Sequence, residues 1–203
     1  MIIKVCGMRD AQNIRAVESL GIDMMGFIFW PRSSRYVCQR PAYLPKCKRV
    51  GVFVNEDIVQ VQRTASGFGL HLIQLHGSES PEYVKQLREW EIIKAFNIAS
   101  ADDLEQTRAY EHIADYFLFD TKGKSVGGNG KKFDWNVLDG YHGNTPFLLS
   151  GGIDPEDAEL LRHWHHPHCV GFDINSCFEL EPGIKDINNI KTFINTIRQH
   201  ESY

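Results

Sequence analysis

The sequence is poor in the features that mark several common protein classes. It has no run of basic residues, and 22 Lys and Arg stand against 26 Asp and Glu, a formal net charge of −4. A mildly acidic chain attracts nucleic acid or an anionic membrane only weakly. The opening segment MIIKVCG is too short and too soon interrupted by charge to be a signal peptide or a membrane-spanning helix. We therefore expect neither nucleic acid nor a membrane as a partner.

Cysteine is scarce and irregularly spaced. The five cysteines are an odd number and include no C-x-x-C pair, so neither a disulfide framework nor a zinc site is predicted. Free thiols are typical of a reducing compartment, and the cytoplasm is the expected location. Hydrophobic residues make up 42% of the chain and charged residues 24%, which is ordinary for a globular protein. Without a linker or a break in composition, residues 1–203 are predicted to form one domain.

Eight short apolar runs recur along the chain, each about as long as a strand buried on both faces. They read IIKVC, MMGFIF, RVGVFV, HLIQLH, EIIKAF, DYFLFD, PFLLS and CVGFDI. The expected strand starts are near Ile2, Met24, Arg49, His71, Glu91, Asp115, Pro146 and Cys169.

Helical patterns fill most of the gaps between these runs. Capping residues precede four of them, namely Asp10, Ser80, Ser100 and Asp154. The expected helices cover residues 11–20, 82–90, 101–110 and 156–164, and the closing stretch 184–200 has one apolar helical face that starts at Ile184. Between the second and third runs, Pro41 and Pro45 leave at best a short or irregular helix.

Strands that alternate with helices indicate a parallel sheet with right-handed crossovers. Eight such units of about 25 residues predict an α/β fold, a single (βα)8 TIM barrel with a closed parallel sheet. A doubly wound open sheet is the alternative, but it usually has fewer strands and a single glycine-rich turn. In a barrel, function lies at the carboxyl ends of the strands. The candidates at or just beyond those ends are Cys6, Arg35, His76, Asp120, Gly151, Gly152 and Asp173.

Seven sequence motifs occur along the chain in this order: KVCGMRD, GFIFWPRSSRYV, VGVFVN, QLHG, DTKGKSVGGNGKKFDW, LSGGI, and GFDINSCFE with PGIKD. Together they resemble the phosphoribosylanthranilate isomerase family of tryptophan biosynthesis, and the match runs almost the full chain. Two positions depart from the family pattern. Asn129 stands where the family usually has Thr or Ser. Cys177 stands where the family often has a glycine after the serine of the loop that follows the eighth strand, which is Ser176 here.

The resemblance implies an Amadori rearrangement that needs no metal and no organic cofactor. N-(5-phosphoribosyl)anthranilate, a small phosphorylated substrate, would become 1-(2-carboxyphenylamino)-1-deoxyribulose 5-phosphate, and the protein is expected to be a monomer. One alternative is the analogous isomerase of histidine biosynthesis, which is disfavoured because the first strand ends in Cys6 and not in a carboxylate. A non-catalytic barrel that binds a phospho-ligand is the other alternative, and it should lack the acid or the base.

Two residues are the candidates for proton transfer. Cys6 is the expected base, although a lone strand cysteine is otherwise a small buried hydrophobe. Lys4 should lie on the same side as Cys6 but deeper in the barrel, so its help to the thiol is not assumed. Asp120 is the expected acid, because a carboxylate that ends an apolar run needs a partner or a task. A helix cap or a loop anchor is the alternative for Asp120.

The remaining candidates would hold the substrate. The resemblance places the anthranilate carboxylate on Arg35, while Arg32 is close by and a solvated loop arginine is the bland alternative. Asp173 is expected to contact the substrate amine or the ribose hydroxyls, and His76 to shape the site without carrying a proton. The phosphate is expected over the last two strands and a glycine-rich flap. The residues for it are Gly128, Asn129, Gly130, Gly151, Gly152, Asn175 and Ser176.

The stretch HWHHPH invites a different interpretation, since dense histidine can indicate a metal. It joins the seventh helix to the eighth strand, which places His163, His165, His166 and His168 at the bottom of the barrel. That face carries stability and not catalysis. No functional metal site is expected.

Overall fold

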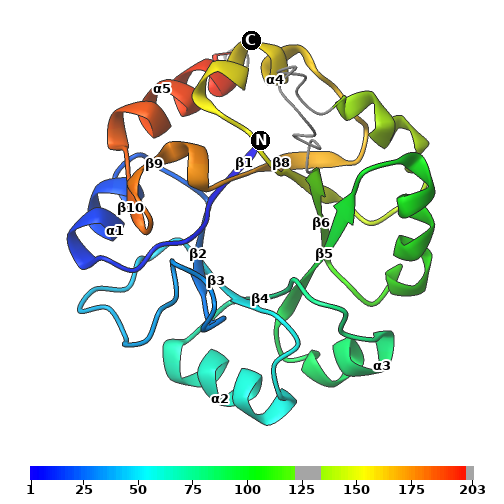
Figure 1. Cartoon of the computed structure of the whole chain (residues 1–203), viewed down its shortest axis with the longest axis horizontal. Coiled ribbons are helices and arrows are strands. Elements are labelled where there is room, and N and C mark those ends of the chain that lie inside the picture. The colour runs from blue at the N-terminus through cyan, green and yellow to red at the C-terminus, as the bar shows by residue number, and fades with distance from the viewer. Residues whose placement is uncertain (122–133, 200–203) are drawn as a thin grey trace.

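Eight parallel strands close into a barrel in chain order in the computed structural model, which describes residues 1–121 and 134–199. Figure 1 shows the ring viewed down the axis of the barrel. The strands are β1 Ile2–Val5, β2 Met24–Ile28, β3 Lys48–Phe53, β4 Leu72–Leu75, β5 Glu91–Ile98, β6 Tyr116–Thr121, β7 Phe147–Ser150 and β8 Cys169–Ile174. Each begins within one residue of the start predicted from its apolar run. The closed ring confirms the predicted barrel and excludes the open sheet.

Helices surround the ring and connect its strands (Figure 1). The α-helices are α1 Ala11–Glu18, α2 Ile58–Phe68, α3 Pro81–Val84, α4 Ala158–His163 and α5 Ile187–Arg198. Short 3-10 helices cover Lys85–Leu87, Ala101–Tyr110, Trp135–Gly140, Pro155–Asp157 and Ser176–Phe178. The Asp10 carboxylate accepts hydrogen bonds from the backbone N–H groups of Gln12 and Asn13, so α1 begins where its cap predicts. Over residues 1–121 and 134–199, no helix combines the length and the apolarity needed to cross a membrane.

Residues 101–110 form a 3-10 helix and not the predicted α-helix. The side chains that this segment buries are compatible with the tighter helix. Leu104 and Thr107 are buried and Tyr110 is half-buried, a spacing of three that matches the three residues per turn of a 3-10 helix. The Thr107 hydroxyl also donates a 2.7 Å hydrogen bond to the Leu104 carbonyl.

The closing segment departs from its prediction at its start. Ile184, expected on the apolar face of the last helix, lies instead in β10 Ile184–Lys185, which pairs antiparallel with β9 Glu179–Glu181. The helix begins only at Ile187 because the Asp186 side chain accepts from the N–H groups of Asn188 and Asn189. The connection 29–47 contains no α-helix, which confirms the irregular segment predicted from its prolines.

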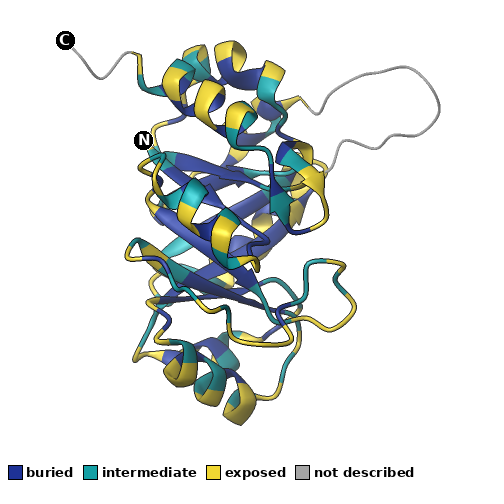
Figure 2. Cartoon of the chain, turned by 90° about the vertical axis from the view of Figure 1, so that its left-hand side faces the viewer, coloured by how far each residue is buried: buried dark blue, intermediate teal, exposed yellow. Residues whose placement is uncertain are grey.

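The core has two parts, one inside the ring and one between the ring and its helices. Inside the ring, the residues near the strand starts are apolar, among them Met24, Val50, Leu72, Leu118 and Leu148. Outside it, the opposite faces of the strands pack against the buried faces of the helices. Figure 2 shows the dark buried strands between helices whose outer faces are exposed. The barrel is therefore filled at the end where its strands begin.

Candidate active site

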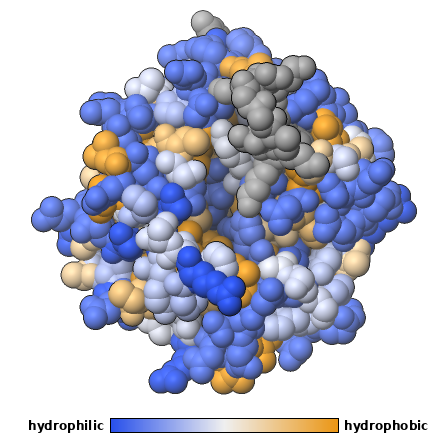
Figure 3. All heavy atoms as spheres, in the orientation of Figure 1, coloured by the Kyte–Doolittle hydropathy of each residue, from blue (hydrophilic) through white to orange (hydrophobic). Residues whose placement is uncertain are grey.

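A cavity of about 340 Å³ opens at the carboxyl ends of the strands. In Figure 3, which views the molecule as Figure 1 does, mostly hydrophilic residues surround a hollow near the centre of this face. Nine of the residues predicted for the site line the cavity, namely Cys6, Arg35, His76, Asp120, Gly151, Gly152, Asp173, Asn175 and Ser176. The other three, Gly128, Asn129 and Gly130, lie outside the described residues.

The polarity of the inward-facing positions changes along each strand. Below the cavity these positions are apolar, as Leu72 of β4 and Leu118 of β6 show. Two residues later the same strands present Gln74 and Asp120, because side chains of a strand return to the same face at every second position. The inward-facing side chains therefore change from apolar to polar between two consecutive inward positions, and the polar ones line the bottom of the cavity.

Cys6 lies just beyond the end of β1, and its side chain is buried, with 4% of the residue exposed. Its backbone N–H donates to the Ile174 carbonyl at 2.9 Å, which extends the β1–β8 pairing to the edge of the cavity. Gly26 of β2 makes room for the thiol, because a Cβ there would lie 2.7 Å from Sγ. Burial raises the pKa of the Cys6 thiol, against the opposing charge of Lys4.

Lys4 is closer to the chemistry than its sequence position predicts. It does lie one inward position deeper than Cys6, but its Nζ donates to Asp173 Oδ1 at 2.7 Å and also to the Cys6 side chain. Burial lowers the pKa of Lys4, while Asp173 and Cys6 more than offset this and hold that pKa above its ordinary value. Asp173 also accepts from Ser150 Oγ at 3.3 Å. Lys4 is thus a buried ammonium beside the candidate base, and sequence reasoning missed it.

Asp120 faces the cavity from β6, three strands around the ring from β1. His76 Nε2 lies 3.4 Å from Asp120 Oδ2, and the other ring nitrogen of His76 is 3.0 Å from Gln74 Nε2. With the Gln74 amide placed this way, Nδ1 would accept from it and Nε2 would carry the imidazole proton toward Asp120. His76 thus lies between Gln74 and the Asp120 carboxyl group.

Arg35 reaches the cavity from the connection that follows β2, and it is already paired. Its Nε and Nη2 donate to Glu179 Oε1 and Oε2 at 2.9 Å and 2.5 Å. These hydrogen bonds raise the pKa of Arg35. Gly7, with φ of +80°, lies against it, since a Cβ at Gly7 would be 2.6 Å from Arg35 Cδ. Sequence reasoning assigned no role to Glu179.

Two loops form the part of the cavity above β7 and β8. Gly151 and Gly152 follow β7 with φ of 93° and 66°, a backbone that favours glycine. After β8, Asn175 precedes the short 3-10 helix that begins at Ser176. Lys185 Nζ donates to Asn175 Oδ1 at 2.7 Å, which places a cation beside this region.

The histidine-rich stretch lies away from the cavity, and one of its histidines packs in the aromatic core while His163 and His165 are exposed. His166 is buried, and its ring centroid is 4.9 Å from that of Phe147. Over residues 1–121 and 134–199, no three His, Cys, Asp or Glu side chains are arranged to hold a metal ion.

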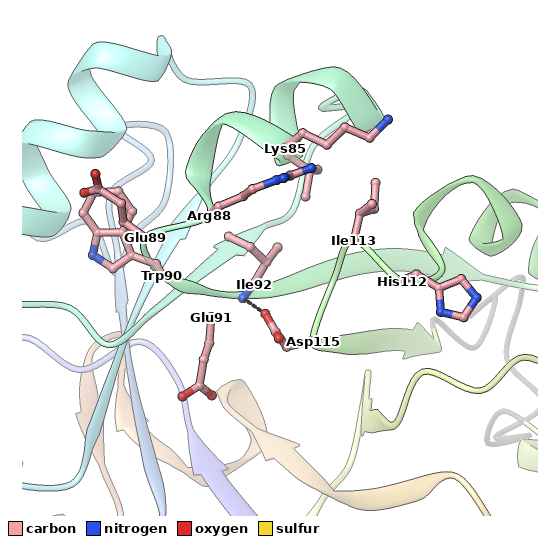
Figure 4. A pocket seen from close by; sticks show the side chains of 10 residues that line it. Lys85, Arg88, Glu89, Trp90, Glu91, Ile92, His112, Ile113 and Asp115 are labelled. Carbon is pink, nitrogen blue, oxygen red and sulfur yellow. Dashed lines mark hydrogen bonds between the residues drawn. The ribbon is translucent and has the colours of Figure 1, made fainter.

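A larger cavity of about 540 Å³ lies where β5 and β6 begin, away from the strand ends that carry the candidates. Figure 4 shows Lys85, Arg88 and His112 around it, and the hydrogen bond from the Ile92 N–H to Asp115 at 2.7 Å. In this fold the starts of the strands form the face that stabilises the protein. We therefore place the active site in the smaller cavity at the strand ends.

Fold and cavity together define a class: a βα-barrel enzyme with candidate acid, base and anion-binding groups at one mouth. Residues 3–196 match the family described as N-(5'phosphoribosyl)anthranilate (PRA) isomerase. The chain belongs to this family. The resemblance drawn from the sequence strings is thereby confirmed, and with it the enzyme class, an isomerase of tryptophan biosynthesis.

Known relatives agree over almost the whole chain. The N-(5'-phosphoribosyl)anthranilate isomerase of Phocaeicola vulgatus is 52% identical over 202 residues, which cover 98% of both chains. That of Parabacteroides distasonis is 52% identical over 206 residues, covering 97% of this chain and 93% of the relative. The crystal structure of phosphoribosyl anthranilate isomerase from Thermotoga maritima superposes with a TM-score of 0.82 at 31% identity, covering 98% and 99% of the two chains. A further isomerase structure, at TM-score 0.81 and 30% identity, holds reduced 1-(o-carboxyphenylamino)-1-deoxyribulose 5-phosphate, with coverage of 98% and 99%.

Proposed function

We propose that this chain converts N-(5-phosphoribosyl)anthranilate to 1-(2-carboxyphenylamino)-1-deoxyribulose 5-phosphate, with Asp120 as general acid and Cys6 as general base. The observation that carries the assignment is their common cavity, which Cys6 enters from beyond β1 and Asp120 from β6. A sugar between them would meet an acid on one wall and a base on the other.

The acid acts first in this scheme. Protonation of the ribose ring oxygen by Asp120 opens the ring to an iminium ion, and the electron pair of the broken C–O bond stays on the new hydroxyl. The Cys6 thiolate then removes the proton from the neighbouring carbon, and the C–H electrons form the enol-amine that becomes the ketone. Each step needs a group within hydrogen-bonding reach of the atom concerned.

The base needs help to ionise, because burial raises the pKa of the Cys6 thiol. Lys4 supplies a positive charge that favours the thiolate, and Asp173 keeps Lys4 in place through the 2.7 Å ion pair. In a site shielded from water, such a fixed charge acts more strongly than it would in solvent.

The two anions of the substrate would bind at separate places in the cavity. Arg35 suits the anthranilate carboxylate because a guanidinium can bind a carboxylate with two parallel hydrogen bonds. The phosphate would lie against the backbone near Ser176 and against Gly151 and Gly152, whose positive φ angles and lack of a Cβ let the main chain approach closely. Asp173 would contact the amine or ribose hydroxyls.

Cys6 and Asp120 enter one cavity of a single chain, so one copy supplies both the proposed base and the proposed acid. This supports a catalytically competent monomer formed by a single domain over residues 1–203. One related structure bears on the point, because it is of monomers generated from the dimeric phosphoribosylanthranilate isomerase of Thermotoga maritima. The free thiols support a cytoplasmic location.

The assignment is tested by supplying purified protein with phosphoribosylanthranilate and following the loss of its fluorescence. Cys6→Ala should lower kcat by two or more orders of magnitude, as expected for lost proton transfer. Cys169→Ala, which removes another thiol of the barrel away from the cavity, is the matched control and should keep the parental rate. Activity of Cys6→Ala within tenfold of the parent would show that Cys6 is a packing residue of the core and not the base.

A further inference from the structure

Glu179 is the one carboxylate that engages Arg35 in the described part of the chain, and it lies outside the strands that form the ring. It belongs to β9 of the small hairpin that follows β8. Its side chain is only 4% exposed, whereas the Arg35 side chain is 21% exposed. Its burial and its pairing with Arg35 distinguish Glu179 from an ordinary solvent-exposed carboxylate on a turn.

The hairpin fixes Glu179 from two further directions. Lys185 lies directly opposite in the β9–β10 register, and its fully buried Nζ donates to Glu179 Oε1 at 2.7 Å. The Gly183 N–H, in the turn of the hairpin, donates to the same oxygen at 3.0 Å. Burial raises the pKa of Glu179, but the hydrogen bonds from Arg35 and Lys185 more than offset this and hold it below its ordinary value. The carboxylate thus stays charged and held in place.

The pairing uses one edge of the Arg35 guanidinium. Nε and Nη2 donate to Glu179, while Nη1 makes only a 3.5 Å contact with Ser34 Oγ. A guanidinium carries five N–H groups in a rigid fork. The edge formed by Nη1 and the second N–H of Nη2 therefore remains able to bind another carboxylate with two hydrogen bonds.

We propose that Glu179 is a positioning residue that holds Arg35 by its Nε–Nη2 edge, so that the Nη1–Nη2 edge is presented to the aromatic carboxylate of the substrate. This rests on the proposed role of Arg35. Lys185 is the second part of the device, because it bonds both Glu179 and Asn175 and so links the carboxylate end of the cavity to its phosphate end. Glu179 touches no substrate atom in this scheme.

The positioning predicts a loss that depends on the substrate. Glu179→Gln keeps the shape of the side chain but removes the charge and one acceptor, which frees the guanidinium to turn. We expect KM for phosphoribosylanthranilate to rise about tenfold, with kcat changed less than about threefold, because binding is lost more than chemistry. The conjugate of ribose 5-phosphate with aniline lacks the aromatic carboxylate. Its KM should change less than about twofold.

The experiment compares Glu179→Gln, Arg35→Ala and the double variant on both substrates, with turnover followed by chromatography and corrected for the uncatalysed rearrangement. Glu181→Gln removes an exposed carboxylate of the same hairpin and is the matched control, with parental constants expected. If Glu179 acts through Arg35, Glu179→Gln adds less than about twofold to the effect of Arg35→Ala.

The outcomes separate this proposal from the one on which it rests. Equal effects of Arg35→Ala on both substrates would overturn the role of Arg35 and, with it, that of Glu179. If Arg35→Ala raises KM only for the substrate with the carboxylate, the role of Arg35 stands. If Glu179→Gln then has no effect, or an equal effect on both substrates, only the positioning role of Glu179 is overturned. Where Glu179→Gln fails to fold, Glu179→Asp keeps the charge but shortens its reach by one methylene. It must show the same substrate selectivity for the proposal to stand.

Discussion

Replacing Lys4 with methionine should strip a buried carboxylate of its counter-charge. Methionine keeps most of the length and the apolar stem of lysine and removes only the ammonium group. Asp173, with 6% of its side chain exposed, would retain the hydrogen bond from Ser150 Oγ but lose the ion pair at 2.7 Å. The effect should appear both in the stability of the fold and in the ionisation of Cys6.

The magnitude follows from the distance and the burial. The Coulomb attraction across this gap is about 6 kcal/mol at an effective dielectric constant of about 20. Desolvation opposes part of it, and removing one partner of a buried pair typically destabilises by about 3–5 kcal/mol. Lys48→Met is the control, because the Lys48–Glu91 pair is similar in length at 2.8 Å but is 44% and 42% exposed. Its loss should be about 0–1 kcal/mol.

The assay is urea unfolding of both variants at several pH values. The pKa of Lys4 is raised in the folded state, so its stabilisation is fully present below the unfolded pKa of about 10.4 and is lost as pH rises through the folded value. The difference between parent and Lys4→Met should thus be constant near neutrality and shrink only above about pH 10. The limb of the kcat/KM profile that reports the Cys6 thiol should move to higher pH.

A loss for Lys4→Met no larger than that for Lys48→Met would refute the stability argument. A thiol limb that does not move would refute the electrostatic one. The two results are independent, because the first concerns Asp173 and the second concerns Cys6.

Three further changes test other parts of the structure. Asp120→Asn should lower kcat by two or more orders of magnitude while substrate binding, measured by calorimetry on a slow variant, stays within a few-fold, since the amide keeps the shape but has no acidic proton. Arg35→Ala should weaken substrate binding by roughly 2–4 kcal/mol. Unchanged kinetic constants would mean that Arg32, or no arginine, binds the aromatic carboxylate. Burial raises the pKa of Cys169 to about 11. Its stabilisation is therefore present below the ordinary thiol pKa of about 8.5 and lost toward pH 11. Cys169→Ala should unfold in urea with a shallower alkaline loss than the parent, and an equal loss would contradict this.

The elements that sequence predicted best are those whose signal is local. A buried strand must be a short apolar run, so β1 to β8 begin within a residue of their predicted starts. Capping is equally local, and the Ser80 hydroxyl does accept from the Tyr83 N–H at the start of α3. A period of three over residues 101–110 was open to either helix type, because apolar side chains at that spacing also suit an α-helix.

The parts of the site that sequence reasoning missed depend on contacts across the chain. Glu179 lies in the string ELE, between the last predicted strand and the closing helix, and only the fold brings it to Arg35, 144 positions earlier. Lys4 interrupts an apolar run, and its meaning depends on Asp173, 169 positions later. A charge within an apolar run is itself a signal, because a buried ammonium requires a partner, but the sequence does not say which one.

The seam between β1 and β8 couples the proposed catalysis to closure of the ring. Cys6, the proposed base, lies at the edge of β1, and Asp173, which holds the neighbouring Lys4 ammonium, is in β8, so the proposed machinery spans the joint where the ring closes. Where β8 is not yet paired with β1, Lys4 lacks its Asp173 partner, and the Cys6 thiol lacks a fixed ammonium beside it. Turnover should consequently appear after the circular dichroism of the helices during refolding. The appearance of enzyme activity during refolding would then report closure of the ring.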